Sequence, residues 1–209
     1  MGFDYSLYLV ADADYASGRD LPALVEAAVE GGVTIVQLRA KSLDRGPFTE
    51  LALAIAGRLA GNGVPLLVND RPEVAAACGA AGVHLGQGDG PVAEARRLLG
   101  PGATIGVSVS TPEEARRAER DGADYVGAGP AYATSTKLTD LAILGPSGIG
   151  RIARSTRLPV VAIGGIGAFN AVGLGQAGAR GIAVVSAILG APDARLAARE
   201  LVRAFKRNL

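Results

Sequence analysis

The stretch DYVGAGPAYATSTK occupies residues 124–137 and indicates how this chain is organised. It begins with an apolar run typical of a short buried strand, and then opens into glycines, hydroxyl side chains and one lysine. Backbone N–H groups, hydroxyl groups and a positive charge are the groups that bind phosphate in proteins. We therefore interpret the stretch as a buried strand followed by a phosphate-binding loop.

The same pattern recurs from one end of the chain to the other. Apolar segments rich in Val, Ile and Leu alternate with amphipathic helical patterns, and the segments are continuous, as in parallel strands buried on both faces. The expected strands are Ser6–Ala11, Val33–Leu38, Pro65–Asn69, Val83–Leu85, Thr104–Val107, Asp124–Gly127, Val160–Ile163 and Gly181–Val185. This even alternation predicts an α/β fold, a single (β/α)8 TIM barrel spanning residues 1–209, with a doubly wound open sheet as the alternative.

Local signals mark where some of the helices begin and end. Thr111 followed by Pro112 and Glu114 predicts a helix start with a capping box. A closing helix is expected over about residues 193–205. The long irregular stretch from Gly129 to Gly145 has the length of an active-site lid.

Composition excludes several classes of function. The formal net charge of +1 provides no bulk attraction to nucleic acid or to an anionic membrane. No apolar run reaches the roughly 18 residues that span a bilayer, and the N-terminus does not resemble an export signal. The single cysteine, Cys78, is expected to be buried in a helix and fits a reducing compartment. We expect a cytoplasmic protein.

Catalytic side chains in such barrels lie at the carboxyl ends of the strands. The second expected strand runs into Gln37, Arg39 and Lys41, which share one face if the extended spacing continues. Two cations and an amide suit an anionic ligand that also has hydrogen-bonding edges. The alternative is a solvated strand end, although Gln37 lies inside an apolar run.

Two aspartates follow the next two strands and suggest a metal site. Asp70 comes directly after the third expected strand, and Asp89 lies in the segment Gly86–Pro91 that follows the fourth. Either one alone is explained as a helix cap. Two carboxylates directed into one barrel mouth are also the usual protein ligands of Mg²⁺, which takes its remaining ligands from substrate phosphates and waters. Both interpretations stay open on the residues alone.

The remaining strand ends predict two phosphate-binding zones. Ser108 follows the fifth strand and has no capping role, because Thr111 already caps the next helix. One zone is cationic, with Arg39, Lys41, Asp70, Asp89 and Lys137, and the other is neutral, with Gly165, Val185 and Ser186. A diphosphate in the first zone and a monophosphate in the second would explain why both exist. The alternative is that the glycines only form tight turns. His84, the single histidine, is interpreted as a core residue rather than a catalytic base.

Taken together, these residues resemble the thiamine-phosphate synthase family over nearly the whole chain. The segments that carry the resemblance are Gln37–Lys41, Asn69-Asp70, Gly82–Asp89, Ile105–Ser108, Gly122–Pro130, Thr134–Lys137 and Val161–Ile166. The resemblance implies a transferase that joins 4-amino-2-methyl-5-hydroxymethylpyrimidine diphosphate to 4-methyl-5-(2-phosphoethyl)-thiazole and releases diphosphate. It also implies a Mg²⁺ cofactor and a pyrimidine carbocation formed as diphosphate departs.

The resemblance also implies a role for each site residue. The pyrimidine diphosphate would be held by Gln37, Leu38, Arg39, Ala40, Lys41, Asn69, Ser108 and Lys137. Arg39, Lys41, Lys137 and Ser108 would be the catalytic residues among them, and Asp70 and Asp89 would bind the metal. The thiazole phosphate would be held by Thr134, Ser135, Thr136, Gly165, Val185 and Ser186.

The sequence departs from the family in one place and leaves two other functions open. After Lys137 the family loop commonly continues into a proline- and glycine-rich turn, whereas here residues 138–145 read LTDLAILG. The alternatives are a thiazole tautomerase, which has the same barrel but does not need the diphosphate and metal residues, and a non-catalytic barrel that binds a phosphate ligand. The expected partners are small molecules, with no nucleic acid or membrane, and a homodimer stays open.

Overall fold

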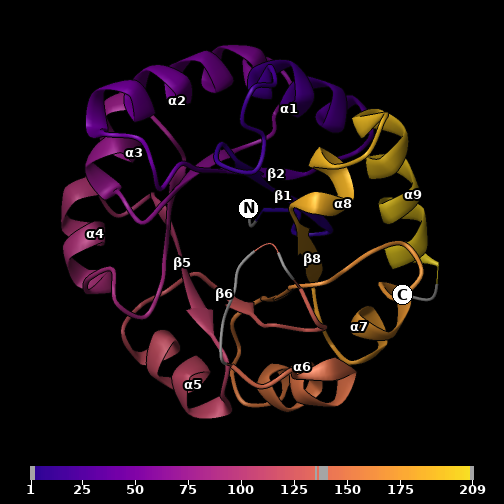
Figure 1. Ribbon diagram of the computed structural model, residues 1–209. Helices are drawn as coiled ribbons and strands as arrows, with labels where there is room; N and C mark the ends of the chain where they lie inside the picture. The colour runs from indigo at the N-terminus through magenta and orange to yellow at the C-terminus, as the bar shows by residue number, and fades with distance from the viewer. Residues whose placement is uncertain (1–2, 135, 137–140, 208–209) are drawn as a thin grey trace.

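Eight parallel strands close into a barrel in the computed structural model, which describes residues 3–134, 136 and 141–207. Each strand pairs with the next one in the chain, and β8 pairs with β1 (Figure 1). The strands are β1 (Leu7–Asp12), β2 (Ile35–Arg39), β3 (Leu66–Asn69), β4 (Gly82–Leu85), β5 (Thr104–Val109), β6 (Tyr125–Ala128), β7 (Val160–Ile163) and β8 (Gly181–Val184). The predicted TIM barrel is confirmed, and closure excludes the open doubly wound sheet.

Helices form a ring outside the barrel, as Figure 1 shows. They are α1 (Leu21–Glu30), α2 (Arg45–Leu59), α3 (Pro72–Cys78), α4 (Val92–Leu99), α5 (Pro112–Arg120), α6 (Gly145–Ala153), α7 (Val172–Gln176), α8 (Ser186–Leu189) and α9 (Ala194–Lys206). Within the described ranges, no helix has the length and apolar character needed to cross a membrane. The short α8 directly after β8 is the extra helical segment that these barrels often carry beside a phosphate site.

Alternation along the strands divides the apolar residues between two cores. The larger cluster fills the space between strands and helices, and includes Leu38, Ala40 and Cys78. The smaller cluster fills the barrel interior and includes Tyr8, Tyr125 and neighbouring aliphatic side chains. Side chains therefore fill the barrel interior away from the carboxyl ends of the strands, and the polar groups lie at those ends.

Two predicted helix boundaries are confirmed. The Thr111 hydroxyl accepts a hydrogen bond from the Glu114 N–H group at 3.1 Å, and the Glu114 carboxylate accepts one from the Thr111 N–H group at 3.3 Å. Asp193 caps α9 by accepting from the Leu196 N–H group at 2.9 Å. The connection from β6, which ends at Ala128, to α6, which begins at Gly145, is the long stretch that the sequence predicts.

A glycine at Gly181 is required for β8 to pair with the start of the chain. A Cβ atom there would lie 1.6 Å from the backbone oxygen of Tyr5, and a backbone atom this close would have to shift. We expect Gly181→Ala to lower the free energy of unfolding by about 1–3 kcal/mol. The measurement is urea denaturation, with Gly57→Ala as control. Gly57 lies in α2 with open space at its Cβ position, so that variant should gain about 0.5–1 kcal/mol. Equal stabilities for the two variants would contradict the packing explanation.

Candidate functional site

A cavity of about 410 Å³ opens at the carboxyl ends of the strands. Its walls combine residues from all eight strands with the loops that follow them. The predicted site residues that line it are Gln37, Arg39, Asn69, Ser108, Thr134, Thr136, Gly165, Val185 and Ser186. The structure therefore brings most of the two predicted zones into one cavity.

The end of β2 separates the predicted residues into two groups. Gln37 and Arg39 face the cavity. Leu38 and Ala40 pack instead into the core between strands and helices, where they are 0% and 1% exposed. Strand alternation explains the difference, because neighbouring side chains point to opposite faces. The side chains of Leu38 and Ala40 are thus kept from the cavity, and only their backbone is left to contact a ligand.

Arg39 is held in place by a buried carboxylate. Its guanidinium forms an ion pair with Asp12, whose side chain is 5% exposed. The other carboxylate oxygen of Asp12 accepts hydrogen bonds from the backbone N–H groups of Asp14 and Tyr15, at 3.0 and 3.1 Å. Asp12 therefore orients the Arg39 fork at the cavity wall, a role that sequence reasoning missed. The signal was an aspartate closing an otherwise apolar strand.

Lys41, Asp70 and Asp89 form a second polar cluster beside the cavity. The Lys41 Nζ atom lies 2.5 Å from Asp70 Oδ2, and the Asp70 and Asp89 carboxyl groups are in hydrogen-bond contact. Burial and the neighbouring Asp70 raise the pKa of Asp89. Burial opposes ionisation of Asp70 as well, but its bonds to Asp89 and Lys41 outweigh that effect and lower the pKa of Asp70. Two carboxyl groups this close disfavour the simultaneous ionisation of both, and here Asp89 is the one whose pKa rises.

Neither aspartate is a helix cap. The N-cap residues of α3 and α4 are Arg71 and Pro91. Asp70 instead has a φ of +65°, which is uncommon outside glycine. A bond of 2.8 Å from the Arg71 N–H group to the Asn69 carbonyl closes a tight turn around it. Asp89 accepts from the Gly86 N–H group at 2.7 Å, which orients its carboxylate across the loop after β4.

The aspartate pair fits a Mg²⁺ ion that is completed by substrate. Within residues 3–134, 136 and 141–207, no group of three or more His, Cys, Asp and Glu side chains is placed to hold a metal by itself. Mg²⁺ commonly uses one or two carboxylates and takes its other ligands from phosphate oxygens and waters. An adjacent carboxylate pair in which one pKa is raised by the other is the electrostatic environment that a cation relieves.

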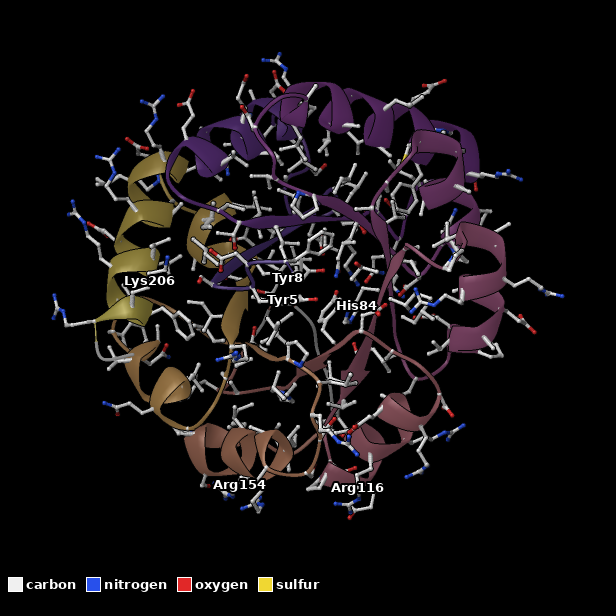
Figure 2. The ribbon with its side chains drawn as sticks, turned by 180° about the vertical axis from the view of Figure 1, so that it is seen from behind. Tyr5, Tyr8, His84, Arg116, Arg154 and Lys206 are labelled. Carbon is white, nitrogen blue, oxygen red and sulfur yellow. The ribbon has the colours of Figure 1, made fainter. Side chains whose placement is uncertain are left out.

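A chain of hydrogen bonds crosses the floor of the cavity. Gln37 Nε2 donates to Tyr8 Oη at 2.7 Å, and the Tyr8 and Tyr125 hydroxyl oxygens lie 2.8 Å apart. His84 Nδ1 lies 2.9 Å from Tyr125 Oη, and His84 Nε2 lies 2.9 Å from Ser108 Oγ. Figure 2 shows Tyr8 and His84 at the centre of the barrel. His84 is thus bonded through both nitrogens, as predicted for a core histidine, but it also faces the cavity.

Tyr8 and Tyr125 were missed as parts of the site. Their rings belong to the interior apolar cluster, and only their hydroxyl groups reach the polar floor. In the sequence, nothing distinguishes these two tyrosines from other aromatic residues in buried strands. The only available signal was a polar atom on a residue expected to face inward.

The neutral zone lies between the main cavity and a neighbouring one of about 520 Å³. Thr134, Thr136, Gly165 and Ser186 line both cavities. Thr136 Oγ1 lies 3.5 Å from Ser186 Oγ, so the loop after β6 meets the start of α8. Gly165 has a φ of +62° and its Cβ position lies 2.3 Å from the Ala133 carbonyl oxygen, so only glycine lets these loops pack. The predicted residues Ser135 and Lys137 lie outside the described residues.

Comparison with known proteins agrees with this arrangement. The family model described as thiamine monophosphate synthase matches residues 7–188. This chain belongs to that family. The thiamine-phosphate synthase of Albidiferax ferrireducens is 51% identical over 93% of this chain and 89% of the relative. The corresponding protein of Chloroflexus aurantiacus is 48% identical over 95% of this chain and 91% of the relative.

A solved structure supports the same assignment. The thiamine phosphate pyrophosphorylase from Pyrococcus furiosus superposes with a TM-score of 0.89 at 36% identity, covering 98% of this chain and 96% of that one. The resemblance predicted from sequence is confirmed at the level of the family. As a member of the family, the protein is a transferase, and its barrel is the family's barrel.

Proposed function

We propose that the protein is a thiamine-phosphate synthase, which joins 4-amino-2-methyl-5-hydroxymethylpyrimidine diphosphate to 4-methyl-5-(2-phosphoethyl)-thiazole. The products are thiamine phosphate and diphosphate. The observation that carries the proposal is that one cavity combines Arg39, beside the Lys41–Asp70–Asp89 cluster, with the neutral zone of Thr134, Gly165 and Ser186. Two phosphorylated substrates need two phosphate-binding zones, and these zones have to be close together for the substrates to react. We place the reaction in the cytoplasm, in keeping with the single buried cysteine.

In this proposal the cationic zone holds the leaving diphosphate. Arg39, Lys41 and Lys137 supply positive charge, Gln37 and Asn69 bind polar edges, and Ser108 donates a hydrogen bond. Asp70 and Asp89 would hold Mg²⁺, which when bound neutralises charge on the diphosphate oxygens. Electrostatic stabilisation of a departing diphosphate is the main requirement of a dissociative substitution.

Bond formation needs no nucleophile from the protein. After the C–O bond to the diphosphate breaks, the thiazole nitrogen attacks the pyrimidine carbocation, and the electron pair of the new C–N bond comes from that nitrogen. Water has to be kept away from the cation. The apolar part of the cavity wall, including Val161, Ile163 and Ile166, suits that task. In this proposal the loop after β6 covers the cavity, since Thr134 and Thr136 of that loop line it.

The neutral zone would place the second substrate. The hydroxyl groups of Thr134, Ser135, Thr136 and Ser186, and the backbone of Gly165 and Val185, provide donors for the thiazole phosphate. Because Thr136 and Ser186 lie across from each other, one phosphate is able to join the loop after β6 to the start of α8. A thiazole tautomerase would need this zone alone. The Lys41–Asp70–Asp89 cluster therefore favours the synthase.

The test is a coupled assay of diphosphate release. We expect release only when both substrates and Mg²⁺ are present, with thiamine phosphate appearing in equal amount. Binding of the thiazole phosphate without any release would instead support the tautomerase or a phosphate-binding barrel, and would make the two aspartates structural.

Lys137 provides a sharper test of the diphosphate zone. We expect Lys137→Ala to slow the chemical step in single-turnover experiments by about 100-fold, because an electrostatic donor to a developing anion is worth about 2.7–4 kcal/mol. The KM for the thiazole phosphate should change little. Single-turnover chemistry at the wild-type rate would contradict a role for Lys137 at the diphosphate.

A further inference from the structure

We propose that the hydrogen-bonded chain Gln37–Tyr8–Tyr125–His84–Ser108 couples two ends of the cavity, so that the orientation of the Gln37 amide decides whether Ser108 offers a proton or a lone pair to a ligand. Tyr8 and Tyr125 are then positioning residues. The chemical class of the ligand rests on the function proposed above. The existence of the coupling does not, because every link lies within this chain.

The links are continuous and short. The four donor–acceptor distances are 2.7, 2.8, 2.9 and 2.9 Å, from Gln37 Nε2 to Ser108 Oγ. Tyr8 and Tyr125 are 2% and 1% exposed, and Gln37 is 4% exposed. In a buried setting each polar atom has to be paired, and a single unpaired group costs about 1–3 kcal/mol. A break in the middle of the chain is therefore disfavoured.

The neighbouring backbone leaves room for this chain. A Cβ atom on Gly106 would lie 2.1 Å from Cζ of Tyr125, and one on Gly127 would lie 3.0 Å from Cε1 of His84. Gly106 and Gly127 belong to the interior of strands β5 and β6, where glycine is unfavourable for the strand itself. Both glycines are explained by the rings that they accommodate.

Proton counting allows two directions for the whole chain. Burial raises the pKa of both Tyr8 and Tyr125, so each hydroxyl keeps its one proton. With the Gln37 amide donating to Tyr8, as in the structure, Tyr8 donates to Tyr125 and Tyr125 donates to His84 Nδ1. His84 then carries its proton on Nε2 and donates to Ser108, whose own proton is free to point into the cavity.

The opposite direction follows if the Gln37 carbonyl oxygen faces Tyr8. Tyr8 then donates to Gln37, Tyr125 donates to Tyr8, and His84 is protonated on Nδ1. Ser108 has to donate to His84 Nε2, and it offers only lone pairs to the cavity. The two ends change together because each hydroxyl has a single proton.

The direction that begins with the Gln37 N–H group donating to Tyr8 matches an aminopyrimidine diphosphate at both ends. Gln37 turns its carbonyl oxygen toward the cavity, where an exocyclic amine on the pyrimidine would donate to it. In that direction the Ser108 O–H group is free to point toward the cavity, where a diphosphate oxygen would accept from it. Binding of the ring at Gln37 would therefore prepare Ser108 to hold the leaving group.

His84 is the only histidine in the chain, so ¹⁵N-histidine NMR reports its tautomer without assignment work. Protonated and unprotonated ring nitrogens differ widely in ¹⁵N chemical shift. In the ligand-free wild type we expect the proton on Nε2. Gln37→Glu is measured at about pH 9.5, above the pKa of roughly 8–9 that burial can give a glutamate, so that it introduces a group that only accepts hydrogen bonds. We expect that variant to move the proton to Nδ1.

Two further variants test the path of the effect. In Gln37→Glu combined with Tyr8→Phe, the link is missing and the tautomer should be that of Tyr8→Phe alone. Tyr5→Phe is the matched control, because the Tyr5 ring packs 5.1 Å from that of Tyr125 while its hydroxyl is not part of the chain. It should leave the tautomer unchanged. Thermal unfolding of each variant verifies that it is folded.

The outcomes are decisive without any substrate. A wild type protonated on Nδ1, or a Gln37→Glu variant that keeps the proton on Nε2, would overturn the inference. So would a shift that persists after Tyr8→Phe is added. A failed synthase assay alongside the predicted NMR shifts would reject the proposed function while leaving the coupling in place. In turnover, Tyr8→Phe should lower kcat/KM for the pyrimidine diphosphate about tenfold, with KM for the thiazole phosphate unchanged.

Discussion

Replacing Asp89 or Asp70 with alanine should reduce Mg²⁺-dependent turnover by more than about 100-fold, because even residues that only support a metal ligand typically change activity 10–100-fold. The two carboxyl groups touch each other, and Lys41 lies 2.5 Å from Asp70. Removal of either one leaves a single carboxylate to hold the cation beside the diphosphate. The measurement is the initial rate of diphosphate release across a range of Mg²⁺ concentrations.

Asp89→Asn distinguishes a role of Asp89 in metal binding from a role in ordering the loop after β4. An asparagine side-chain oxygen still accepts a hydrogen bond from the Gly86 N–H group, as Asp89 does at 2.7 Å, but the negative charge is lost. We expect Asp89→Asn to fold like the wild type and to be as inactive as Asp89→Ala. If Asp89→Asn recovers full activity, Asp89 orders the loop after β4 and does not bind metal.

Asp193→Ala is the control for removing a structural carboxylate. Asp193 caps α9 by accepting from the Leu196 N–H group at 2.9 Å. Loss of such a cap costs about 1 kcal/mol of stability. The dependence of the rate on Mg²⁺ should stay that of the wild type.

Arg39→Ala should lower the free energy of unfolding by about 3 kcal/mol, because it leaves a buried charge without its partner. Asp12 is 4% exposed and would keep only its two bonds to backbone N–H groups. The measurement is urea denaturation of the ligand-free protein. The same variant should weaken binding of inorganic diphosphate in the presence of Mg²⁺, because the cavity loses a cation.

Three variants control this prediction. Arg58 pairs with Glu26 at 2.6 Å on the helix surface, where the two side chains are 48% and 39% exposed, so Arg58→Ala should cost no more than about 1 kcal/mol. Adding Asp12→Asn to Arg39→Ala should restore part of the lost stability, since no buried charge then remains. Arg39→Lys keeps the charge but loses the planar fork, and should be intermediate. If Arg39→Ala is as stable as Arg58→Ala, the buried ion pair has no structural importance.

Much of the fold could be predicted from local sequence patterns. The eight strands were predicted to within a few residues, because a parallel strand buried on both faces has a continuous apolar sequence. The capping box at Thr111 and Glu114 was equally readable, since its bonds join residues three apart. The metal and phosphate roles of individual residues stay predictions, although the cavity brings many of those residues together.

Other parts of the site depend on contacts between distant residues. Leu38 and Ala40 lie in the same motif as Gln37 and Arg39, yet the alternation of β2 turns them into the outer core. Lys41 continues the motif beyond the strand and pairs with Asp70 rather than lining the cavity. Whether an aspartate caps a helix or faces a carboxyl group from the next loop depends on backbone geometry that no short motif encodes.

Hydrophobic periodicity and the alternation of strands with helices are local features, so the barrel and the edge at which polar groups gather could be inferred along the chain. Which of those groups meet depends on the closed sheet. The bond between the Tyr8 and Tyr125 hydroxyls joins residues 117 positions apart, and the ion pair of Asp12 with Arg39 joins neighbouring strands. Closure of the sheet brings these groups together, and burial then requires each of them to find a partner.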